Sequence, residues 1–222
     1  MSSERQIHCR SELKQYMEAD RIASGYTRRR NLALCLDPVL RFQRLLRVAE
    51  YCDNRRGCLL GRIRFVFHWL RLQRMRIRLG LSIPLGVFGP GLSIAHYGSI
   101  VVNKNAKVGA NCRIHPGVCI GISHGRAPQI GDNVYLGPGA KVFGGITIGD
   151  NVAIGANAVV NRDVPCGVTV AGNPARIVSH RGSVELIIPG TELRGIRDID
   201  WSRYETAEAF HGPIREDKHG DE

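Results

Sequence analysis

Residues 102–160 read VNKNAKVGANCRIHPGVCIGISHGRAPQIGDNVYLGPGAKVFGGITIGDNVAIGANAVV, and this stretch decides the fold. In steps of six, with one interruption of four residues, it carries a column of aliphatic residues: Val102, Val108, Ile114, Ile120, Ile130, Leu136, Val142, Ile148, Ile154 and Val160. The residue after the column position is Gly in six repeats and Asn in two. An α-helix has a period of about 3.6 and a half-buried strand a period of 2, so a repeat of six fits neither.

A second column lies two residues before the first and contains no charged residue: Ile100, Ala106, Cys112, Val118, Pro128, Val134, Ala140, Ile146, Val152 and Ala158. A hexapeptide repeat of this kind predicts a β-helix, in which three strand-and-corner units make one triangular coil of about 18 residues. The aliphatic residue points inward, and Gly or Asn suits the corner because both tolerate positive φ. Prisms of this repeat class coil left-handed. We therefore predict a mainly β protein built on a left-handed parallel β-helix.

The chain has 222 residues, enough for one domain with a sizeable core or two small ones. It has no run of 18 apolar residues and no visible signal peptide, so we expect a cytoplasmic protein whose seven cysteines are reduced. The net charge of +11 is confined to residues 1–80, which hold 18 Lys and Arg against 7 Asp and Glu. The remaining residues hold 13 of each sign, so the repeat domain is not basic.

Residues 1–80 are expected to form an α-helical N-terminal domain. The signals predict a helix over 11–23 with Ser11 as N-cap, a second from Asp37-Pro38 to about residue 51, and a third from about residue 60 to 79, ended by Gly80. The β-helix should occupy residues 81–178. Residues 179–222 form a polar tail, which we expect to be mostly mobile from Arg181 onward, with a short helix near 198–207.

The third helix carries six arginines between residues 61 and 79, with aromatic and aliphatic residues between them. Such a helix can pack in a subunit interface with its arginines solvated, or it can lie on the anionic inner face of a membrane. Both interpretations stay open from the sequence. No nucleic-acid-binding motif accompanies the arginines, so we expect no nucleic-acid partner.

Two irregularities interrupt the repeat. Phe88 and Ile94 fit the column, but the register slips by two residues before Val102, and His96 lies inside that slip. The second irregularity is the insertion within 122–129 (ISHGRAPQ). Irregular loops on a rigid repeat wall are where binding and catalytic sites tend to be built.

Three segments resemble the hexapeptide-repeat acyltransferases, and among them the serine O-acetyltransferases: 91–102 (GLSIAHYGSIVV), 127–134 (APQIGDNV) and 171–177 (AGNPARI). The resemblance covers less than half of the chain. It implies an enzyme that transfers acetyl from its co-substrate acetyl-CoA to a hydroxyl group, without a metal. By its position in the motif, His96 would be the general base. Histidine suits this role because its ordinary pKa lies near 6.5.

The resemblance also implies substrate-binding residues. Arg126, in the position of the family's Arg-His-Pro loop motif, would pair with a carboxylate or phosphate. His115 should share a corner with His96 on the next coil, and both His115 and the insertion-loop residue His124 would lie beside the acceptor. Coenzyme A would follow the later coils. Its contacts would include small residues that admit the pantetheine arm and arginines that meet phosphates: Gly139, Ala156, Asn161, Arg162 and Arg176.

The chain departs from the cysteine-biosynthetic members of this family at three positions, one of which is Ser82, near the place of an earlier Asp that orients the catalytic His. Ala95 stands where they have Asp immediately before the catalytic His, and Ala127 stands where they have the His of the loop motif. Because residues 54–131 contain no Asp or Glu, a carbonyl, a hydroxyl, or a group from the helices or another subunit must orient His96. The acceptor is therefore either free serine or a sugar hydroxyl of a surface polysaccharide or its precursor.

Two other classes of function stay open. A zinc hydratase of the carbonic-anhydrase kind would need three neutral imidazoles in a fixed array, but the expected His pair five residues apart is absent. A non-catalytic β-helix scaffold is the other class. For the assembly, the resemblance implies a homotrimer with active sites between neighbouring prisms, and the N-terminal helices could join two trimers.

Overall fold

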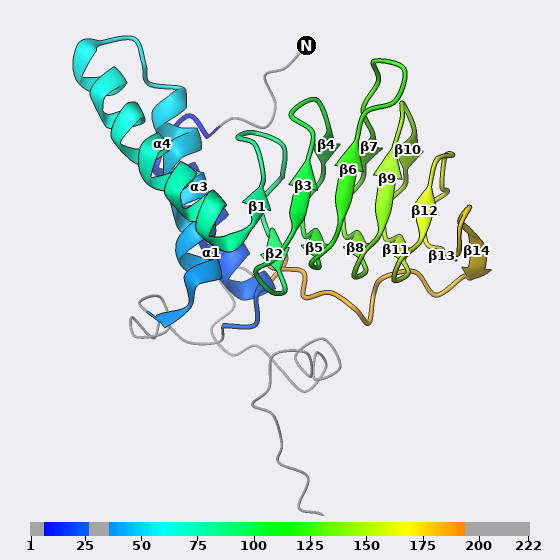
Figure 1. The fold of residues 1–222 in the computed structure, drawn as a ribbon. Coiled ribbons are helices and arrows are strands. Elements are labelled where there is room, and N and C mark those ends of the chain that lie inside the picture. The colour runs from blue at the N-terminus through cyan, green and yellow to red at the C-terminus, as the bar shows by residue number, and fades with distance from the viewer. Residues whose placement is uncertain (1–6, 27–35, 194–222) are drawn as a thin grey trace, which may run out of the picture.

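The structure, a computed structural model, describes residues 7–26 and 36–193. Three helices precede a β-helix whose coils stack away from the helical end of the molecule (Figure 1). The helices are α1 (Arg10–Ala23), α3 (Pro38–Asp53) and α4 (Leu59–Leu79). Among the described residues, none of the helices combines the length and the apolarity that a membrane span requires.

The β-helix is a triangular prism with one sheet on each face. The first face holds β1 (Leu81–Ser82), β3 (Ile100–Val102), β6 (Cys119–Gly121), β9 (Lys141–Phe143) and β12 (Val159–Val160). The second face holds β4 (Lys107–Val108), β7 (Gln129–Ile130) and β10 (Thr147–Ile148). The third face holds β2 (Ser93–Ile94), β5 (Arg113–Ile114), β8 (Tyr135–Leu136), β11 (Ala153–Ile154), β13 (Thr169–Ala171) and β14 (Arg176–Ser179). The strands pair in parallel, except that β14 runs antiparallel to β13.

Strand pairing follows the predicted period. Val142 pairs with Val160, 18 residues later, while Val108 pairs with Ile130 across the four-residue insertion. Ile94 pairs with Ile114, which is 20 residues later and so contains the predicted slip of two. All residues of both predicted columns are buried. The prediction of a left-handed parallel β-helix that follows N-terminal helices is confirmed.

The helix ends agree with the sequence signals except at α1. Asp37 caps α3, because its Oδ1 accepts hydrogen bonds from two backbone N–H groups of the first turn, and Gly80 ends α4 in the left-handed conformation at φ 68°. The predicted N-cap Ser11 is wrong, because α1 begins at Arg10 and Cys9 is its cap. The reason is a reciprocal pair: the Cys9 thiol accepts from the Glu12 N–H, and the Glu12 carboxylate accepts from the Cys9 N–H.

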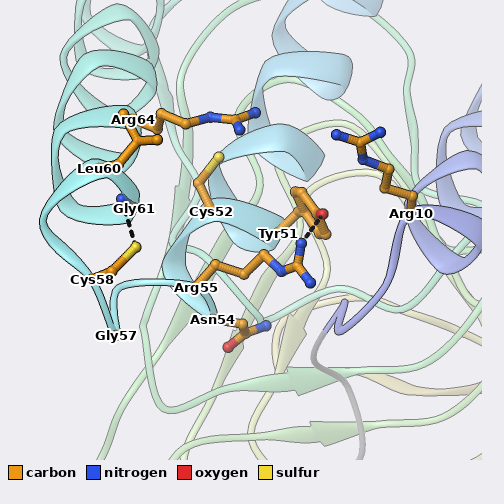
Figure 2. A pocket seen from close by; sticks show the side chains of 10 residues that line it. All are labelled: Arg10, Tyr51, Cys52, Asn54, Arg55, Gly57, Cys58, Leu60, Gly61 and Arg64. Atoms are coloured by element: carbon orange, nitrogen blue, oxygen red, sulfur yellow. Dashed lines mark hydrogen bonds between the residues drawn. The ribbon is translucent and has the colours of Figure 1, made fainter.

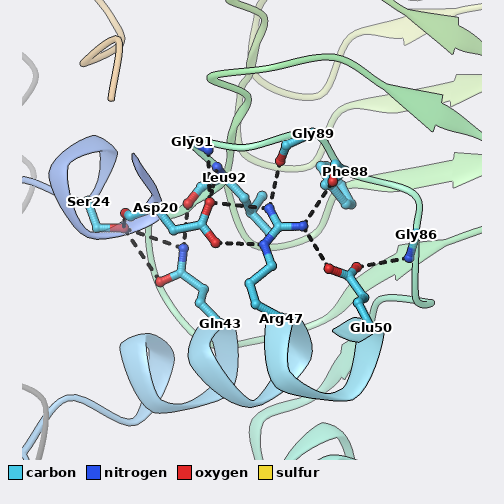
Figure 3. Close-up of polar contacts among 10 residues, drawn as sticks. All are labelled: Asp20, Ser24, Gln43, Arg47, Glu50, Gly86, Phe88, Gly89, Gly91 and Leu92. Atoms are coloured by element: carbon cyan, nitrogen blue, oxygen red, sulfur yellow. Dashed lines mark hydrogen bonds and ion pairs between the residues drawn. The ribbon is translucent and has the colours of Figure 1, made fainter. Parts of the chain in front are cut away.

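Arg47 of α3 is fully buried and ties the helices to the first coil of the prism (Figure 3). Its guanidinium donates to Asp20 of α1 at 2.8 Å and to Glu50 at 3.0 Å. It also donates to the backbone carbonyls of Phe88 at 2.9 Å and Gly89 at 2.6 Å, which belong to the first coil. One side chain therefore joins α1, α3 and the β-helix.

The two carboxylates of this cluster contact the first coil as well. Asp20 accepts from the backbone N–H groups of Gly91 and Leu92 at 2.9 and 2.8 Å, and Glu50 accepts from that of Gly86 at 2.9 Å. Burial raises the pKa of both carboxyls, and the adjacent guanidinium opposes that rise. The cluster is thus a buried ion network in which the positive charge of Arg47 and the negative charges of Asp20 and Glu50 stabilise one another.

The segment 181–193 differs from the expected mobile tail. It runs back along the prism towards α1, with Ser183, Ile187 and Ile188 buried. Asn111 at a prism corner accepts from the Thr191 backbone N–H at 3.1 Å. The prediction rested on the mean polarity of the tail and gave no weight to these two isoleucines. Their burial offsets the conformational entropy that the segment loses when it is ordered. The short helix expected near 198–207 lies outside the described residues.

We expect Arg47→Met to destabilise the protein strongly, because it leaves two buried carboxylates without their cation. Breaking a buried ion pair from one side costs about 3–5 kcal/mol. Urea unfolding should show a loss of that size in the free energy of unfolding. Arg44→Met is the matched control, since Arg44 is exposed on the same helix and should change that free energy by less than about 0.5 kcal/mol. Equal losses in the two variants would contradict the role given to Arg47.

Candidate functional site

His96 lies at the corner where the chain passes from β2 on the third face to β3 on the first face. Its side chain is exposed, whereas that of Ala95 before it is buried. Backbone hydrogen bonds hold this corner, including one from the Gly98 N–H to the Leu79 carbonyl at 2.9 Å. A histidine on such a corner presents its imidazole to molecules outside the prism.

His115 lies at the same corner one coil later, but its surroundings differ. Ile94 pairs with Ile114, and the backbone N–H of Ala95 donates to the Ile114 carbonyl. The residue that aligns with His115 on the preceding coil is therefore Ala95 and not His96. Its side chain is only 3% exposed, and its ring centroid lies 5.1 Å from that of Tyr135. His115 is therefore packed against the prism, while His96 faces outward.

The four-residue insertion forms a small hairpin at another corner, where the chain passes from the first face to the second. Ser123 and Arg126 exchange two backbone hydrogen bonds of 3.0 Å. Between them, His124 and Gly125 both have positive φ, of 50° and 73°. That pair of conformations is typical of a two-residue type I′ turn. The Ser123 hydroxyl lies 3.0 Å from His124 Nδ1 and helps to fix the ring.

A cavity of about 550 Å³ lies beside this hairpin. It brings together three predicted site residues, His124, Arg126 and Asn161. Phe143, Gly144 and Gly145 also line it, without having been predicted from the sequence. A departure from the repeat could have identified them in the sequence, because Phe replaces the usual Gly after the column position and a Gly-Gly pair follows.

Gly145 explains how the Arg126 side chain lies over this cavity. A Cβ atom at Gly145 would come within 2.6 Å of the Arg126 Cβ and 2.7 Å of its Cδ. The absence of a side chain therefore leaves room for the stem of Arg126 to cross the next coil. The guanidinium can then present several N–H donors to a carboxylate or phosphate in the cavity.

The residues predicted to bind coenzyme A divide between two corners and the final strand. Gly139 and Ala156 follow β8 and β11, at the corner between the third and first faces. Asn161 and Arg162 follow β12, at the corner between the first and second faces. Arg176 begins β14 and is exposed, with one nitrogen donating to the Ala175 carbonyl at 2.9 Å.

His96 and Arg126 thus lie on opposite edges of the first face. His96 precedes β3, at the edge where strands of this face begin, and Arg126 follows β6, at the edge where they end. A rigid sheet of the prism separates the two corners (Figure 1). Within one chain the structure does not bring the predicted base and the predicted anion-binding arginine together.

The three histidines named from the sequence lie at separate places in the described part of the chain. His96 is on an exposed corner, His115 is buried beside Tyr135, and His124 is on the hairpin. Residues 7–26 and 36–193 contain no group of three His, Cys, Asp or Glu side chains placed to hold one metal ion. The three-imidazole array of a zinc hydratase is therefore not assembled in this part of a single chain.

Known proteins resemble the chain in both sequence and structure. Residues 127–162 match the family described as bacterial transferase hexapeptide (six repeats). The chain is 41% identical over 153 residues to a serine acetyltransferase of Synechococcus elongatus, which covers 60% of this chain and 63% of that protein.

Solved structures extend the similarity into the helical domain. A serine acetyltransferase of Brucella abortus has 31% identity and a TM-score of 0.57, over 77% of this chain and 69% of that chain. The same enzyme has been solved in complex with coenzyme A. A serine acetyltransferase of Neisseria gonorrhoeae in complex with serine has 28% identity and a TM-score of 0.57, over 75% of this chain and 69% of that chain.

The chain spans less than two thirds of the length of the first curated relatives that it matches, at 63%, 32% and 45% of their sequences.

Proposed function

The chain belongs to the serine acetyltransferase family of hexapeptide-repeat transferases, and we propose that it transfers the acetyl group of acetyl-CoA to a hydroxyl group. The observation that carries this proposal is His96, which has the motif position of the base and lies exposed on a fixed corner of the prism. The coenzyme A complex of a relative supports acetyl-CoA as the donor.

In the proposed reaction, neutral His96 removes the proton of the acceptor hydroxyl as its oxygen attacks the thioester carbonyl. The tetrahedral intermediate carries an oxyanion, which backbone N–H groups at a corner can stabilise. When the intermediate collapses, the carbon–sulfur bond breaks and the ester forms. The imidazolium of His96 then returns the proton to the thiolate of coenzyme A.

The helix carboxylates that contact the first coil already have a cationic partner. Asp20 and Glu50 are the acidic residues buried against that coil, and both are bound to Arg47. No Asp or Glu occurs between residues 54 and 131. We propose that a carbonyl, a hydroxyl, or a group from the helices or another subunit positions the imidazole and so sets its tautomer.

The acceptor is proposed to be a small hydroxyl compound bound near Arg126. The serine complex of a relative and the guanidinium above the cavity favour serine, whose carboxylate Arg126 can pair with. Ala95 and Ala127 favour a second candidate, a sugar hydroxyl, since each removes a polar group that the family uses around serine. Both candidates use the same base and the same donor.

Replacing His96 with Asn tests the reaction. We expect His96→Asn to keep its fold and its affinity for coenzyme A but to lose turnover by about 10²–10⁴-fold, the usual contribution of a general base. The measurement is thiol release from acetyl-CoA with a panel of serine, sugar nucleotides and oligosaccharides. Wild-type protein should release thiol with one acceptor class only, which identifies the acceptor.

His115→Asn is the matched control, because His115 lies at the same corner one coil later but is buried. It should cost less turnover than His96→Asn. If His96→Asn retained more than about a tenth of the wild-type rate while His115→Asn was inactive, the two roles would be exchanged. No thiol release with any acceptor would contradict the proposed function itself.

We propose that the active protein is a homotrimer whose sites form between neighbouring prisms. The support is the separation of His96 and Arg126 on opposite edges of one face, since a site that uses both needs one corner from each of two chains. The division of the coenzyme A residues between the same two corners points the same way. A cyclic arrangement of three chains supplies three such sites.

Subunit complementation tests the shared site. His96→Asn and Arg126→Gln should each be inactive alone, but co-expressed chains should recover activity, because a site with His96 from one chain and Arg126 from the next is native. Random assembly makes about a quarter of the sites native. Co-expression of His96→Asn with a chain carrying both substitutions is the control and should stay inactive. Recovery no greater than this control, or a monomer by light scattering, would contradict the shared site.

We also propose peripheral contact of α4 with an anionic membrane surface. This helix exposes aliphatic and aromatic residues, among them Ile63, Phe67 and Leu70, between arginines, and it contains no acidic residue. Such a face can insert apolar groups at the headgroup level while its charges meet lipid phosphates. A cytoplasmic location stays a prediction of the sequence.

Vesicle co-sedimentation tests this contact. Binding to vesicles that contain anionic lipid should weaken as salt is raised, because the attraction is screened. Each basic residue near such a surface contributes about 1 kcal/mol, so Arg71→Gln with Arg74→Gln should weaken binding roughly thirtyfold. Lys104→Gln with Lys107→Gln removes the same charge from exposed positions on the β-helix and should have little effect. Absence of binding at low salt would end the proposal.

A further inference from the structure

A second cavity, of about 490 Å³, lies in the helical domain (Figure 2). It sits where the end of α3 meets the starts of α4 and α1, and none of its lining residues belongs to the β-helix. Three arginines line it, each from a different part of the chain: Arg10 of α1, Arg55 of the α3–α4 connection and Arg64 of α4. Neither Asp nor Glu is among its lining residues.

Within residues 7–26 and 36–193, none of the three positive charges is paired with a carboxylate. The ion pairs of the described residues involve Arg21, Arg47 and Arg56, and none involves the three arginines of this cavity. Arg55 has a polar partner, because it donates to the Tyr51 hydroxyl at 2.6 Å, but that partner is neutral. Three cations around one cavity repel one another, and an anion placed among them would remove that repulsion.

The floor of the cavity consists of buried side chains. Tyr51 and Cys52 form this floor and are buried. Burial raises the pKa of the Cys52 thiol, and the charges of Arg64 and Arg55 oppose that rise, so both guanidinium groups act on the floor. Arg10, Arg55 and Arg64 are themselves exposed, so all three are accessible to an anion that enters the cavity.

We propose that this cavity binds the phosphate group of a phosphorylated ligand, with Arg10, Arg55 and Arg64 as its cationic partners. Guanidinium groups offer paired N–H donors that match phosphate oxygens, and three of them suit a group of more than one negative charge better than a single carboxylate. The cavity is larger than a phosphate, so it has room for the group that carries it. Leu60 at the mouth is 66% exposed and offers that group an apolar contact.

The phosphate can come from a soluble phosphoester or from a lipid headgroup, and both have the same chemistry at the arginines. The site does not depend on the proposed acetyl transfer, because its lining residues include neither His96 nor any residue of the hairpin cavity. Arg64→Gln should therefore leave acetyl transfer unchanged, so a failure of one proposal is distinguishable from a failure of the other.

Titration calorimetry of the full chain with inorganic pyrophosphate, in the presence of saturating coenzyme A to occupy the donor site, measures the affinity. We expect Arg10→Gln and Arg64→Gln each to raise the Kd about tenfold, as loss of one charge-assisted contact does. Arg74→Gln is the matched control, because Arg74 is an exposed arginine of the same helix outside the cavity, and it should change the Kd less than about twofold.

Alkylation of Cys58 reports occupancy at the cavity itself. Cys58 lines the cavity and is exposed, while Cys166 is exposed on the β-helix and serves as an internal control. Pyrophosphate should slow alkylation of Cys58 by iodoacetamide several-fold and leave Cys166 unchanged, as followed by mass spectrometry of the two peptides.

Vesicles of phosphatidylcholine with phosphatidic acid distinguish the two sources. Protection of Cys58 by vesicles, lost in Arg64→Gln, would assign a lipid headgroup. Protection by pyrophosphate alone would assign a soluble phosphoester. Protection of Cys58 by neither probe, or equal pyrophosphate affinity in the wild-type protein and both cavity variants, would overturn the proposal.

Discussion

The stacking of aliphatic side chains inside the prism is the interaction on which the rest of the structure depends. Val142 lies beside Val160 and Ile130 beside Ile148, coil upon coil, with essentially no solvent exposure. A branched side chain that faces its equivalent one coil away fills the narrow interior, and in a regular coil that equivalent comes 18 residues later. The spacing of the aliphatic residues therefore sets the length of each regular coil and the places of its corners.

Because that interior is rigid, extra residues can leave the repeat only at the corners. The extra residues between β6 and β7 form a hairpin at one corner, and the extra residues between β2 and β3 form the loop that carries His96 at another. Both irregularities preserve the inward column on either side. The prism thus holds two chemically different corners at a fixed separation. A second copy of the chain can place one of its corners beside the unlike corner of the first.

The helical domain is joined to the prism by hydrophobic packing, since Phe42, Leu46 and Leu72 belong to the same buried cluster as the prism interior, and by a buried polar network. Arg47 contacts one carboxylate of α1, one carboxylate of α3 and two backbone carbonyls of the first coil. The cost of desolvating its charge is therefore offset only when α1, α3 and the prism are all in place. That dependence fixes how α3 sits on the first coil. Most of the other arginines in residues 7–26 and 36–80 are exposed to solvent, and this explains how the helical segment can carry so many positive charges without destabilising the β-helix.

Much of this protein follows from the sequence alone, because a period of six with inward aliphatic residues admits one architecture. The columns, the register slip, the insertion, the Asp37 and Gly80 helix ends and the position of His96 all come from local patterns that act over a few residues. Tertiary structure decided what depends on contacts between distant segments. The burial of His115 beside Tyr135, the opening that Gly145 leaves for Arg126, the packing of 181–193 along the corner asparagines, and the convergence of three arginines beside Cys52 are of this kind. Spacing along the chain carries no record of these contacts, since each depends on which side chains the coils and helices place opposite one another in space.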